Sequence, residues 1–422
     1  MRAAFVSLRL VNFRYLWYSQ IASFTGMQMQ QVARGLLAYQ LTGSYAAVGV
    51  VMMAWGIPQT LFSLVGGAVA DRVNRRNIIL VVQFGTAGLS LLTAFLIMID
   101  QISIPILFVM GLFQGTLFAF NMPARQAYLA ELVPQSELMN AIALNNMAMN
   151  ATRIIGPTIA GVVIAVWDIE AAYYLQSFLY LFVIYFMLRL PASTGHLKNA
   201  DKRRSVAAEI GEGLRYVRNS PTLRLLILMA FIPTILGMPY MTLLPGFAVD
   251  ELGQGPGSYG FMFTITGVGA IVGSLAIASL TGYPRKPLMQ VVTGLGWGAS
   301  LIALGLVSKQ FGYIGALASL AALGLFSTTY QTLNNTMVMA ATDKEYYGRV
   351  MSIYMLTFSV FPLVAGPMGV VADHLSATTT FALLGVGISL FVVMVFAVNP
   401  RYALSDERTR SPQPERDASA AG

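Results

Sequence analysis

Apolar runs of about 20 residues, separated by short polar breaks, recur from one end of the chain to the other. Each run is long enough to cross a hydrocarbon core of about 30 Å as an α-helix. We therefore expect an all-α membrane protein with twelve transmembrane helices. The predicted spans of the first six are 14–39, 46–70, 77–99, 105–127, 140–166 and 171–190, and those of the second six are 221–247, 257–281, 288–308, 311–340, 346–371 and 377–398.

A longer polar break separates the two sets of spans. Within it Val206, Ile210, Leu214 and Val217 share one helical face opposite charged residues, a pattern typical of an amphipathic helix on a membrane surface. The polar, proline-containing end of the chain predicts disorder. Four regions follow: an N-terminal six-helix bundle 1–190, a cytoplasmic linker 191–220, a C-terminal six-helix bundle 221–400 and a disordered cytoplasmic tail 401–422.

Positive charges are distributed unevenly over the loops. With the N-terminus inside, Lys and Arg gather on the inner segments around 72–76, 198–218, 285–286 and 344–349, whereas the outer loops hold only Lys309. Because cytoplasmic loops are enriched in Lys and Arg, both termini are predicted to be cytoplasmic. We expect a multi-pass protein of a bacterial cytoplasmic (inner) membrane, whose formal charge of +8 faces anionic lipid rather than nucleic acid.

The composition excludes several classes of function. Of the 422 residues 56% are hydrophobic and 10% are charged, against about 25% charged in soluble domains. Cysteine is absent and His196 and His374 are the only histidines, so disulfides, thiol catalysis and a Cys- or His-ligated metal site are not expected. The sequence has no Gly-x-x-x-x-Gly-Lys nucleotide-binding loop and no cluster of carboxylates. We expect neither an enzyme nor a cofactor.

An internal repeat supports the division into two halves. Gly156-Pro157 recurs as Gly366-Pro367, and Arg75-Arg76 recurs as Arg285-Lys286, both 210 positions later (156 to 366, 75 to 285). Asn121 recurs as Asn334, 213 positions later (121 to 334). Two homologous six-helix halves are a common transporter plan, with the substrate site between the halves near the middle of the membrane.

The loop between the second and third helices carries the most specific motif. Residues 67–76 read GAVADRVNRR. This segment resembles the loop signature of the major facilitator superfamily, Gly-x-x-x-Asp-Arg-x-Gly-Arg-Arg, with Asn74 in place of glycine. We expect this change to be mild because asparagine tolerates the left-handed conformation.

The resemblance implies the major facilitator fold and a conformational latch. In that family the aspartate, here Asp71, meets the N-terminus of helix 11, here near Gly348, when the inner side is closed. A carboxylate at a helix N-terminus is favoured by about 0.3–2 kcal/mol. The alternative is that these charges only set the topology. The implied latch set is Gly67, Asp71, Arg72, Arg75, Arg76, Gly348 and Arg349.

A Gly-Pro motif in helix 5 points toward export. Residues 156–161 read GPTIAG, which resembles a motif associated with antiporters of the superfamily. Proline removes a backbone hydrogen bond and glycine permits close helix contact, so we expect hinges in helices 5 and 11. The segment 123–145 is similar to the bacterial branch that includes the enterobactin exporter. The predicted hinge residues are Gly156, Pro157, Gly161, Gly366 and Pro367.

Polar side chains at membrane depth usually face a cavity, because burying them in lipid is costly. Asn146, Asn150 and Arg153 share one face of helix 5, and they predict either a substrate pathway or an interhelical hydrogen-bond knot. Arg125 is expected either on the helix 4 stripe or snorkelling to the inner surface. The remaining cavity candidates are Gln28, Gln31 and Arg34 in helix 1, Gln114 and Asn121 in helix 4, and Gln331, Asn334 and Asn335 in helix 10.

No Asp or Glu lies in the middle of a predicted helix, so an arginine-bearing cavity favours anionic or neutral polar substrates. We expect a monomeric secondary active transporter that works by alternating access, with protons as the candidate coupling ion. Export by antiport of a small molecule such as a siderophore, a drug or a metabolite is the preferred hypothesis. An uptake symporter or a lysophospholipid flippase of the same fold is the alternative.

Overall fold

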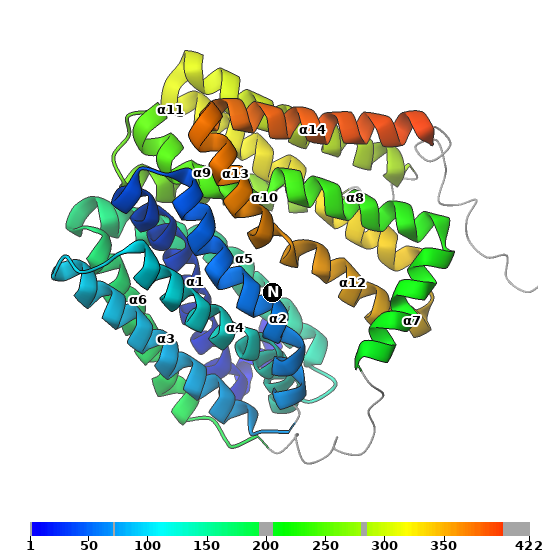
Figure 1. Cartoon of the computed structure of the whole chain (residues 1–422). Helices are drawn as coiled ribbons and strands as arrows, with labels where there is room; N and C mark the ends of the chain where they lie inside the picture. Colours follow the sequence, from blue (N-terminus) through cyan, green and yellow to red (C-terminus); the bar gives the residue numbers. More distant parts are fainter. Residues whose placement is uncertain (1, 71, 194–205, 280–284, 400–422) are drawn as a thin grey trace, which may run out of the picture.

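The computed structural model describes residues 2–70, 72–193, 206–279 and 285–399. In these ranges all regular structure is helical, which confirms the predicted all-α class (Figure 1). Asp71, assigned to the latch, and the tail 401–422, expected to be disordered, lie outside the described residues, as do residues 194–205 of the linker.

Six long helices form the N half. They follow a short 3-10 helix at Arg2–Arg9, and each ends where the polar breaks of the sequence begin. Their bounds are α1 Val11–Thr42, α2 Tyr45–Ala70, α3 Arg75–Met98, α4 Ile104–Leu132, α5 Leu138–Trp167 and α6 Ile169–Leu188.

The C half follows the linker helix α7, Val206–Asn219. Two of its predicted helices are each divided in the structure, one before Pro239 and one at Val360, close to Pro362, because proline cannot continue the helical hydrogen-bond ladder. The bounds are α8 Pro221–Gly237, α9 Tyr240–Gly246, a π-helix Phe247–Glu251, α10 Gly257–Ser279, α11 Lys286–Ala340, a 3-10 helix Lys344–Tyr346, α12 Tyr347–Ser359, α13 Phe361–Leu375 and α14 Ala377–Val398.

Ten helices in the described residues are long and apolar enough to cross a membrane. One of them, α11, joins two helices across Gly312, whose backbone is not helical (φ 58°, ψ −141°). The further span is α1, which has 32 residues but is too polar to qualify by hydropathy. Several of its polar side chains, among them Gln20, Gln30 and Arg34, are buried. Two spans within α11 and the addition of α1 give the twelve that the sequence predicts.

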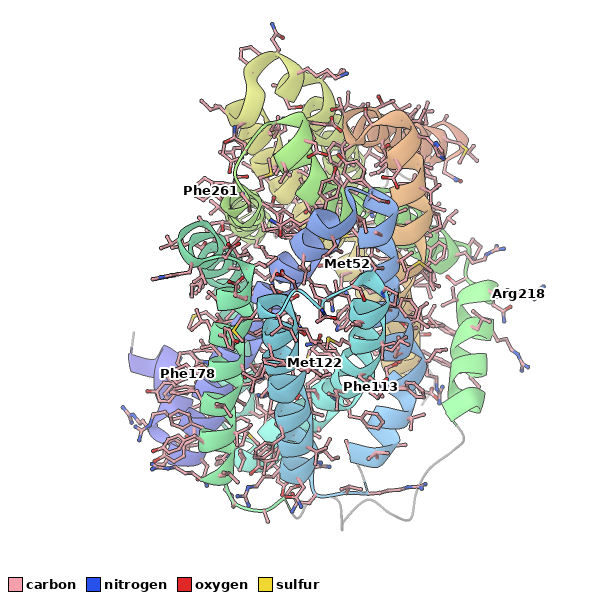
Figure 2. All side chains as sticks on the ribbon, turned by 60° about the vertical axis from the view of Figure 1, so that its left-hand side comes forward. Met52, Phe113, Met122, Phe178, Arg218 and Phe261 are labelled. Carbon is pink, nitrogen blue, oxygen red and sulfur yellow. The ribbon has the colours of Figure 1, made fainter. Side chains whose placement is uncertain are left out.

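Apolar side chains also cover the outer surface of the helices. Phe113, Phe178 and Phe261 are 61%, 64% and 45% exposed, while Met52 is buried (Figure 2). In water this surface would be unfavourable, and a belt of exposed apolar residues is what lipid contact requires. Arg218 lies on α7, beside the C half.

The two halves meet at one end of the molecule. There α2 packs against α13 and α5 packs against α10. In Figure 1 the halves converge near α9, and their other ends point in different directions. We call the end that carries Asp250, Glu251 and Asp373 the acidic end, and the end that carries Arg75, Arg76 and Arg349 the basic end.

Candidate functional site

Carboxylates form hydrogen bonds between the two halves at the acidic end. Asp373, near the end of α13, accepts hydrogen bonds from the Ser44 hydroxyl (2.7 Å) and from the backbone N–H groups of Tyr45 (2.7 Å) and Ala46 (3.1 Å). These are free donors at the start of α2, where a negative charge is favoured. A carboxylate of the C half therefore caps a helix of the N half.

Two tyrosines of the N half extend this closure. The Tyr39 hydroxyl donates to Asp250 Oδ2 at 2.5 Å, and the Tyr45 hydroxyl donates to Glu251 Oε1 at 3.4 Å. Glu251 also accepts from the backbone N–H groups of Ala377 (2.7 Å) and Thr378 (3.2 Å), so it caps α14. The acidic end is closed by these contacts together with the cap at Asp373.

Three of the predicted hinge residues lie in the two seams between the halves: Pro157, Gly161 and Gly366. A Cβ added to Gly260 of α10 would lie 2.5 Å from the Pro157 carbonyl oxygen and 2.6 Å from Gly161 Cα. In the other seam a Cβ on Gly49 of α2 would lie 2.6 Å from Gly366 Cα. Helix α5 continues through Pro157 without a break. These glycines permit close packing of the halves.

The remaining hinge residues pack close to the same seams. Gly156 faces α1 within the N half, where an added Cβ would lie 2.5 Å from Gln28 Cβ. Pro367 lies inside α13, seven residues after the break at Val360. The C-half motif therefore follows a break in its helix, whereas the N-half motif sits in an unbroken one.

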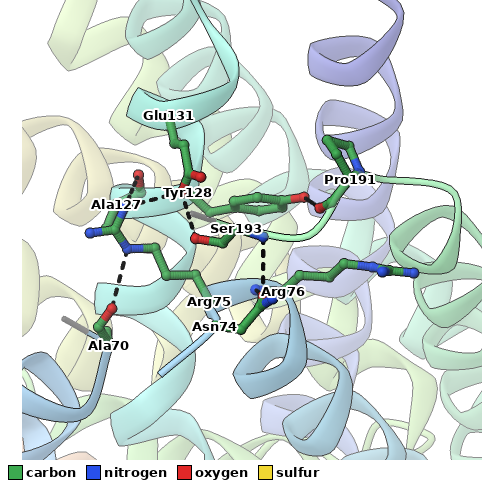
Figure 3. Close-up of polar contacts among 9 residues, drawn as sticks. All are labelled: Ala70, Asn74, Arg75, Arg76, Ala127, Tyr128, Glu131, Pro191 and Ser193. Atoms are coloured by element: carbon green, nitrogen blue, oxygen red, sulfur yellow. Dashed lines mark hydrogen bonds and ion pairs between the residues drawn. The ribbon is translucent and has the colours of Figure 1, made fainter. Parts of the chain in front are cut away.

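At the basic end the loop motif is bound within the N half (Figure 3). Arg75 donates to the Ala70 carbonyl (3.2 Å) and forms an ion pair with Glu131 (3.1 Å), which also accepts from the Ser193 hydroxyl (2.6 Å). Arg76 donates to the carbonyl oxygens of Met187 (2.9 Å) and Leu188 (2.7 Å). The two arginines join α3 to α2, to α4 and to the end of α6.

Asn74 has a local reason to replace glycine. Its φ is −55°, outside the left-handed region, so our expectation about that conformation was wrong. The side-chain oxygen instead accepts from the Arg76 N–H (3.1 Å), which caps α3, and from the Ser193 N–H (3.2 Å). Asn74 is the N-cap of α3, a position that favours asparagine.

The linker helix α7 packs against the start of α12. Arg349 forms an ion pair with Glu212 of α7 (3.2 Å), and the rings of Tyr216 and Tyr346 stack with centroids 4.2 Å apart. Burial raises the pKa of the Tyr216 hydroxyl, which remains a donor to Asp343 (2.8 Å).

The predicted latch partners are apart in this state. A Cβ on Gly67 or Gly348 would meet nothing within 4 Å, and Arg72 is exposed. The structure does not bring the described latch residues of the two halves together.

The predicted cavity residues fall into two groups. The first lies where the halves face each other: Asn146, Asn150 and Arg153 are exposed on α5, and Gly267 of α10 packs against the Arg153 backbone. The Gln31 amide approaches the Met241 sulfur of α9 at 3.8 Å. Three further predicted cavity residues are partly exposed, as Gln31 is: Gln28 of α1, and Gln331 and Asn335 of α11.

The second group is buried among packed helices. Gln114 exchanges hydrogen bonds with Gln30, and Asn121 accepts from Arg125 at 3.0 Å. Arg125 is 0% exposed, so it does not snorkel to the surface. The remaining members are Arg34, whose guanidinium lies 5.5 Å from the Trp55 ring centre, and Asn334, which donates to the Leu226 carbonyl at 3.0 Å.

Sequence reasoning did not identify the closure at the acidic end. No contact between the halves was predicted for Asp250, Glu251 or Asp373, and Tyr39 and Tyr45 were not singled out. The available signal was an aspartate just beyond a transmembrane helix, as at Asp71. Among the described residues no group of three or more His, Asp or Glu could hold a metal ion.

Comparison with known proteins places the chain among membrane transporters. A family model described as transmembrane secretion effector, of the major facilitator superfamily, matches residues 2–419. The staphyloferrin A transporter of Staphylococcus aureus is 24% identical over 402 residues, 94% of this chain and 98% of that protein. The enterobactin exporter EntS of Shigella flexneri is 25% identical over 393 residues, 91% of this chain and 92% of that protein.

Solved transporters share the fold. The nucleoside transporter NupG superposes with a TM-score of 0.71 at 12% identity, over 91% of this chain and 98% of that one. A bacterial homologue of the lysosomal transporter Spinster gives a TM-score of 0.70 at 14% identity, over 96% and 98%. The relatives are transporters rather than enzymes, as the sequence predicted. The chain belongs to the transmembrane secretion effector family of the major facilitator superfamily.

Proposed function

We propose that the protein exports an anionic or polar small molecule of the siderophore class from the cytoplasm, by alternating access. The family and the two siderophore transporters among its relatives support this class. The observation that carries the proposal is the exposed stripe of Asn146, Asn150 and Arg153 on α5, next to the α10 seam. A guanidinium binds carboxylate and other oxyanion groups with paired hydrogen bonds.

In the proposed cycle the acidic end faces outside, and the structure corresponds to the state that is closed there. Opening would break the Asp373 cap on α2 and the contacts of Tyr39 and Tyr45. At the basic end Asp71 would then meet the start of α12. Arg349, now paired with Glu212, would change its neighbours in that step.

The orientation can be tested directly because the chain has no native cysteine. We expect a cysteine at position 168 or 250 to react with an impermeant maleimide in intact cells, whereas one at position 76 reacts only after permeabilisation. Labelling of position 168 that requires permeabilisation would reverse the proposed topology.

Transport is tested in a host that lacks its own siderophore exporters. Cells that make enterobactin or staphyloferrin A are compared with and without the protein, and the siderophore is measured inside the cells and in the medium. Export predicts a lower intracellular and a higher external level. Arg153→Gln, at equal expression, should abolish the difference, and Arg189→Gln at the end of α6 is the matched control.

The same assay separates the alternative functions. Uptake by symport predicts greater intracellular accumulation of added siderophore, and a lysophospholipid flippase predicts lipid movement in vesicles without siderophore transport. Proton coupling is tested by the loss of export when the pH gradient is collapsed. We propose a monomer as the working unit.

A further inference from the structure

A small cavity lies inside the N half, away from the seams between the halves. Side chains of α1, α2, α3, α4 and α6 line it, and the space open to a water-sized sphere is about 20 Å³. This is room for about one or two particles of the size of water, too little for a transported organic molecule. Its polar lining consists of Ser23, Gln30, Gln83, Thr86, Gln114, Asn121 and Tyr180.

Two buried arginines contact residues that line this cavity, although neither arginine lines it itself. Arg125 donates to Asn121 Oδ1 (3.0 Å), which lines the cavity, and to the Ser19 hydroxyl (3.5 Å), one helical turn from Ser23. Arg34 follows Gln30 by one turn, and its guanidinium lies over the Trp55 ring, which also lines the cavity. Ser23 and Gln30 therefore lie on α1 between the two guanidinium groups.

The charge of both arginines is uncompensated in the part of the chain that the structure describes. Arg34 Nε and Nη1 and Arg125 Nη2 are buried donors without a hydrogen-bond partner there. The acidic residues of the N half that the structure describes lie at helix ends: Asp100, Glu131, Glu137, Asp168 and Glu170. A buried charge without a counter-charge is unfavourable, so a site with two of them attracts an anion.

We propose that the cavity binds one small inorganic anion of the size of chloride, which balances Arg34 and Arg125. The hydroxyl groups of Ser23 and Tyr180 are available as donors to it, in addition to side-chain amides. Gln83 is 1% exposed and its Oε1 has no partner, and turning its amide presents N–H groups instead. A water molecule also fits the volume, but it would leave the two charges unbalanced. This inference does not depend on the transported substrate.

The test is thermal unfolding of the purified full chain in detergent, in sodium chloride and in sodium gluconate at equal ionic strength. Gluconate is too large for the cavity. We expect the Tm to rise with chloride concentration and to saturate, as it does for a bound ligand, and bromide to act like chloride. Gluconate should give no saturating rise.

Variants separate this site from general salt effects. Arg125→Gln and Gln83→Met, which nearly conserves volume, should lose the chloride-dependent rise, while Arg153→Gln between the halves should retain it. Equal Tm values of the wild type in chloride and gluconate would overturn the proposal, and so would a rise that persists in Gln83→Met. If Arg125→Gln does not fold, Gln83→Met decides alone, because it keeps both arginines. The Tm measurement does not involve siderophore export, so it tests anion binding independently of the proposed function.

Discussion

Helix α5 of the N half and its repeat in the C half, α12 and α13, differ in the chemistry of their exposed residues. Shifted by the 210 positions that relate the Gly-Pro pairs, Asn146, Asn150 and Arg153 correspond to Leu356, Val360 and Leu363. Leu356 and Leu363 are 48% and 46% exposed, so the C-half face is apolar. The repeat preserved the fold and the seam, while the polar stripe is present on one half only.

The interiors of the halves differ in the same way. Asn121 and Asn334 are equivalent and both are buried, but the residue one turn later is Arg125 in the N half and Val338 in the C half, each 0% exposed. Arg125 lies among the polar partners of the N half. Around Asn334 the core contains Trp297 and Tyr330, whose hydroxyl donates to the Met229 carbonyl at 2.7 Å. A charge is therefore tolerated only where polar groups surround it.

The largest effect is expected when a buried charge like that of the N half is introduced into the core of the C half. Val338→Arg would bury a guanidinium in an apolar core, and an uncompensated buried charge costs about 3–5 kcal/mol. We expect loss of folded protein in size-exclusion chromatography or a large fall in Tm. Val338→Leu adds one methylene and no charge, and overpacking of this kind costs about 1–3 kcal/mol, so its fall in Tm should be smaller. A wild-type Tm for Val338→Arg would show that the C half accepts charge equally well.

Alanine substitutions at two glycines test whether overpacking between the halves affects stability differently from overpacking within a half. A Cβ at Gly115 would overlap the Trp55 carbonyl in the N half, and one at Gly56 would overlap Pro362 across the α2–α13 seam. Gly115→Ala should lower the free energy of unfolding by about 1–3 kcal/mol, because the helices within one half cannot move apart to relieve the overlap. Gly56→Ala should keep a near-wild-type Tm while export falls, because the halves can separate. Equal stability losses in both variants would contradict this distinction.

Asp373→Asn tests the cap that joins the halves at the acidic end. The variant keeps the size of the side chain but loses the charge at the start of α2, which is worth up to about 2 kcal/mol. One to two kcal/mol shifts a two-state population by a factor of about 5–30. In a Met53→Cys background, where a Cβ added to Gly366 of α13 would lie 2.5 Å from the Met53 sulfur across the seam, the labelling rate by an impermeant maleimide should rise accordingly.

Asp168→Asn is the matched control for that cap. Asp168 accepts from the Ile169 N–H of its own half (3.2 Å) and makes no cap across the halves. We expect no change in Met53→Cys labelling in this variant. An unchanged rate in Asp373→Asn as well would remove the cap from the gating mechanism.

The fold could be predicted because membrane spans depend on long local patterns, whereas the site depends on which face each residue presents. The apolar runs and the repeat predicted twelve helices, including α1, whose polar residues point inward. The three-residue steps in α1 placed Gln28, Gln31 and Arg34 together, but Arg34 is buried beside Trp55. A difference of one helical turn in depth and direction decides between cavity and bundle interior, and a single sequence does not specify it.

The contacts between the halves were the least predictable part. Asp373 and the start of α2 are over 320 positions apart in the sequence, and only the packing of the halves brings them together. Local motifs carried information about their own surroundings, as Arg75 and Arg76 did. They carried none about partners in the other half, because those partners are distant in the sequence, as Asp373 is from Tyr45.

The smallest expected effect concerns Arg153, which belongs to the polar stripe that is present on the N half only. Arg153→Lys keeps the charge but loses the planar pair of donors, so a substrate oxyanion would be held by one hydrogen bond fewer. A loss of about 0.5–1.5 kcal/mol corresponds to an apparent KM raised by a factor of about 2–13. If Arg153 instead fixes helix packing through Asn146 and Asn150, Tm in detergent should fall and KM should not change. Measuring both quantities on one purified variant decides between the two roles. Leu363→Met, at the equivalent apolar position, should change neither, and a KM effect there equal to that of Arg153→Lys would mean that the two faces contribute alike.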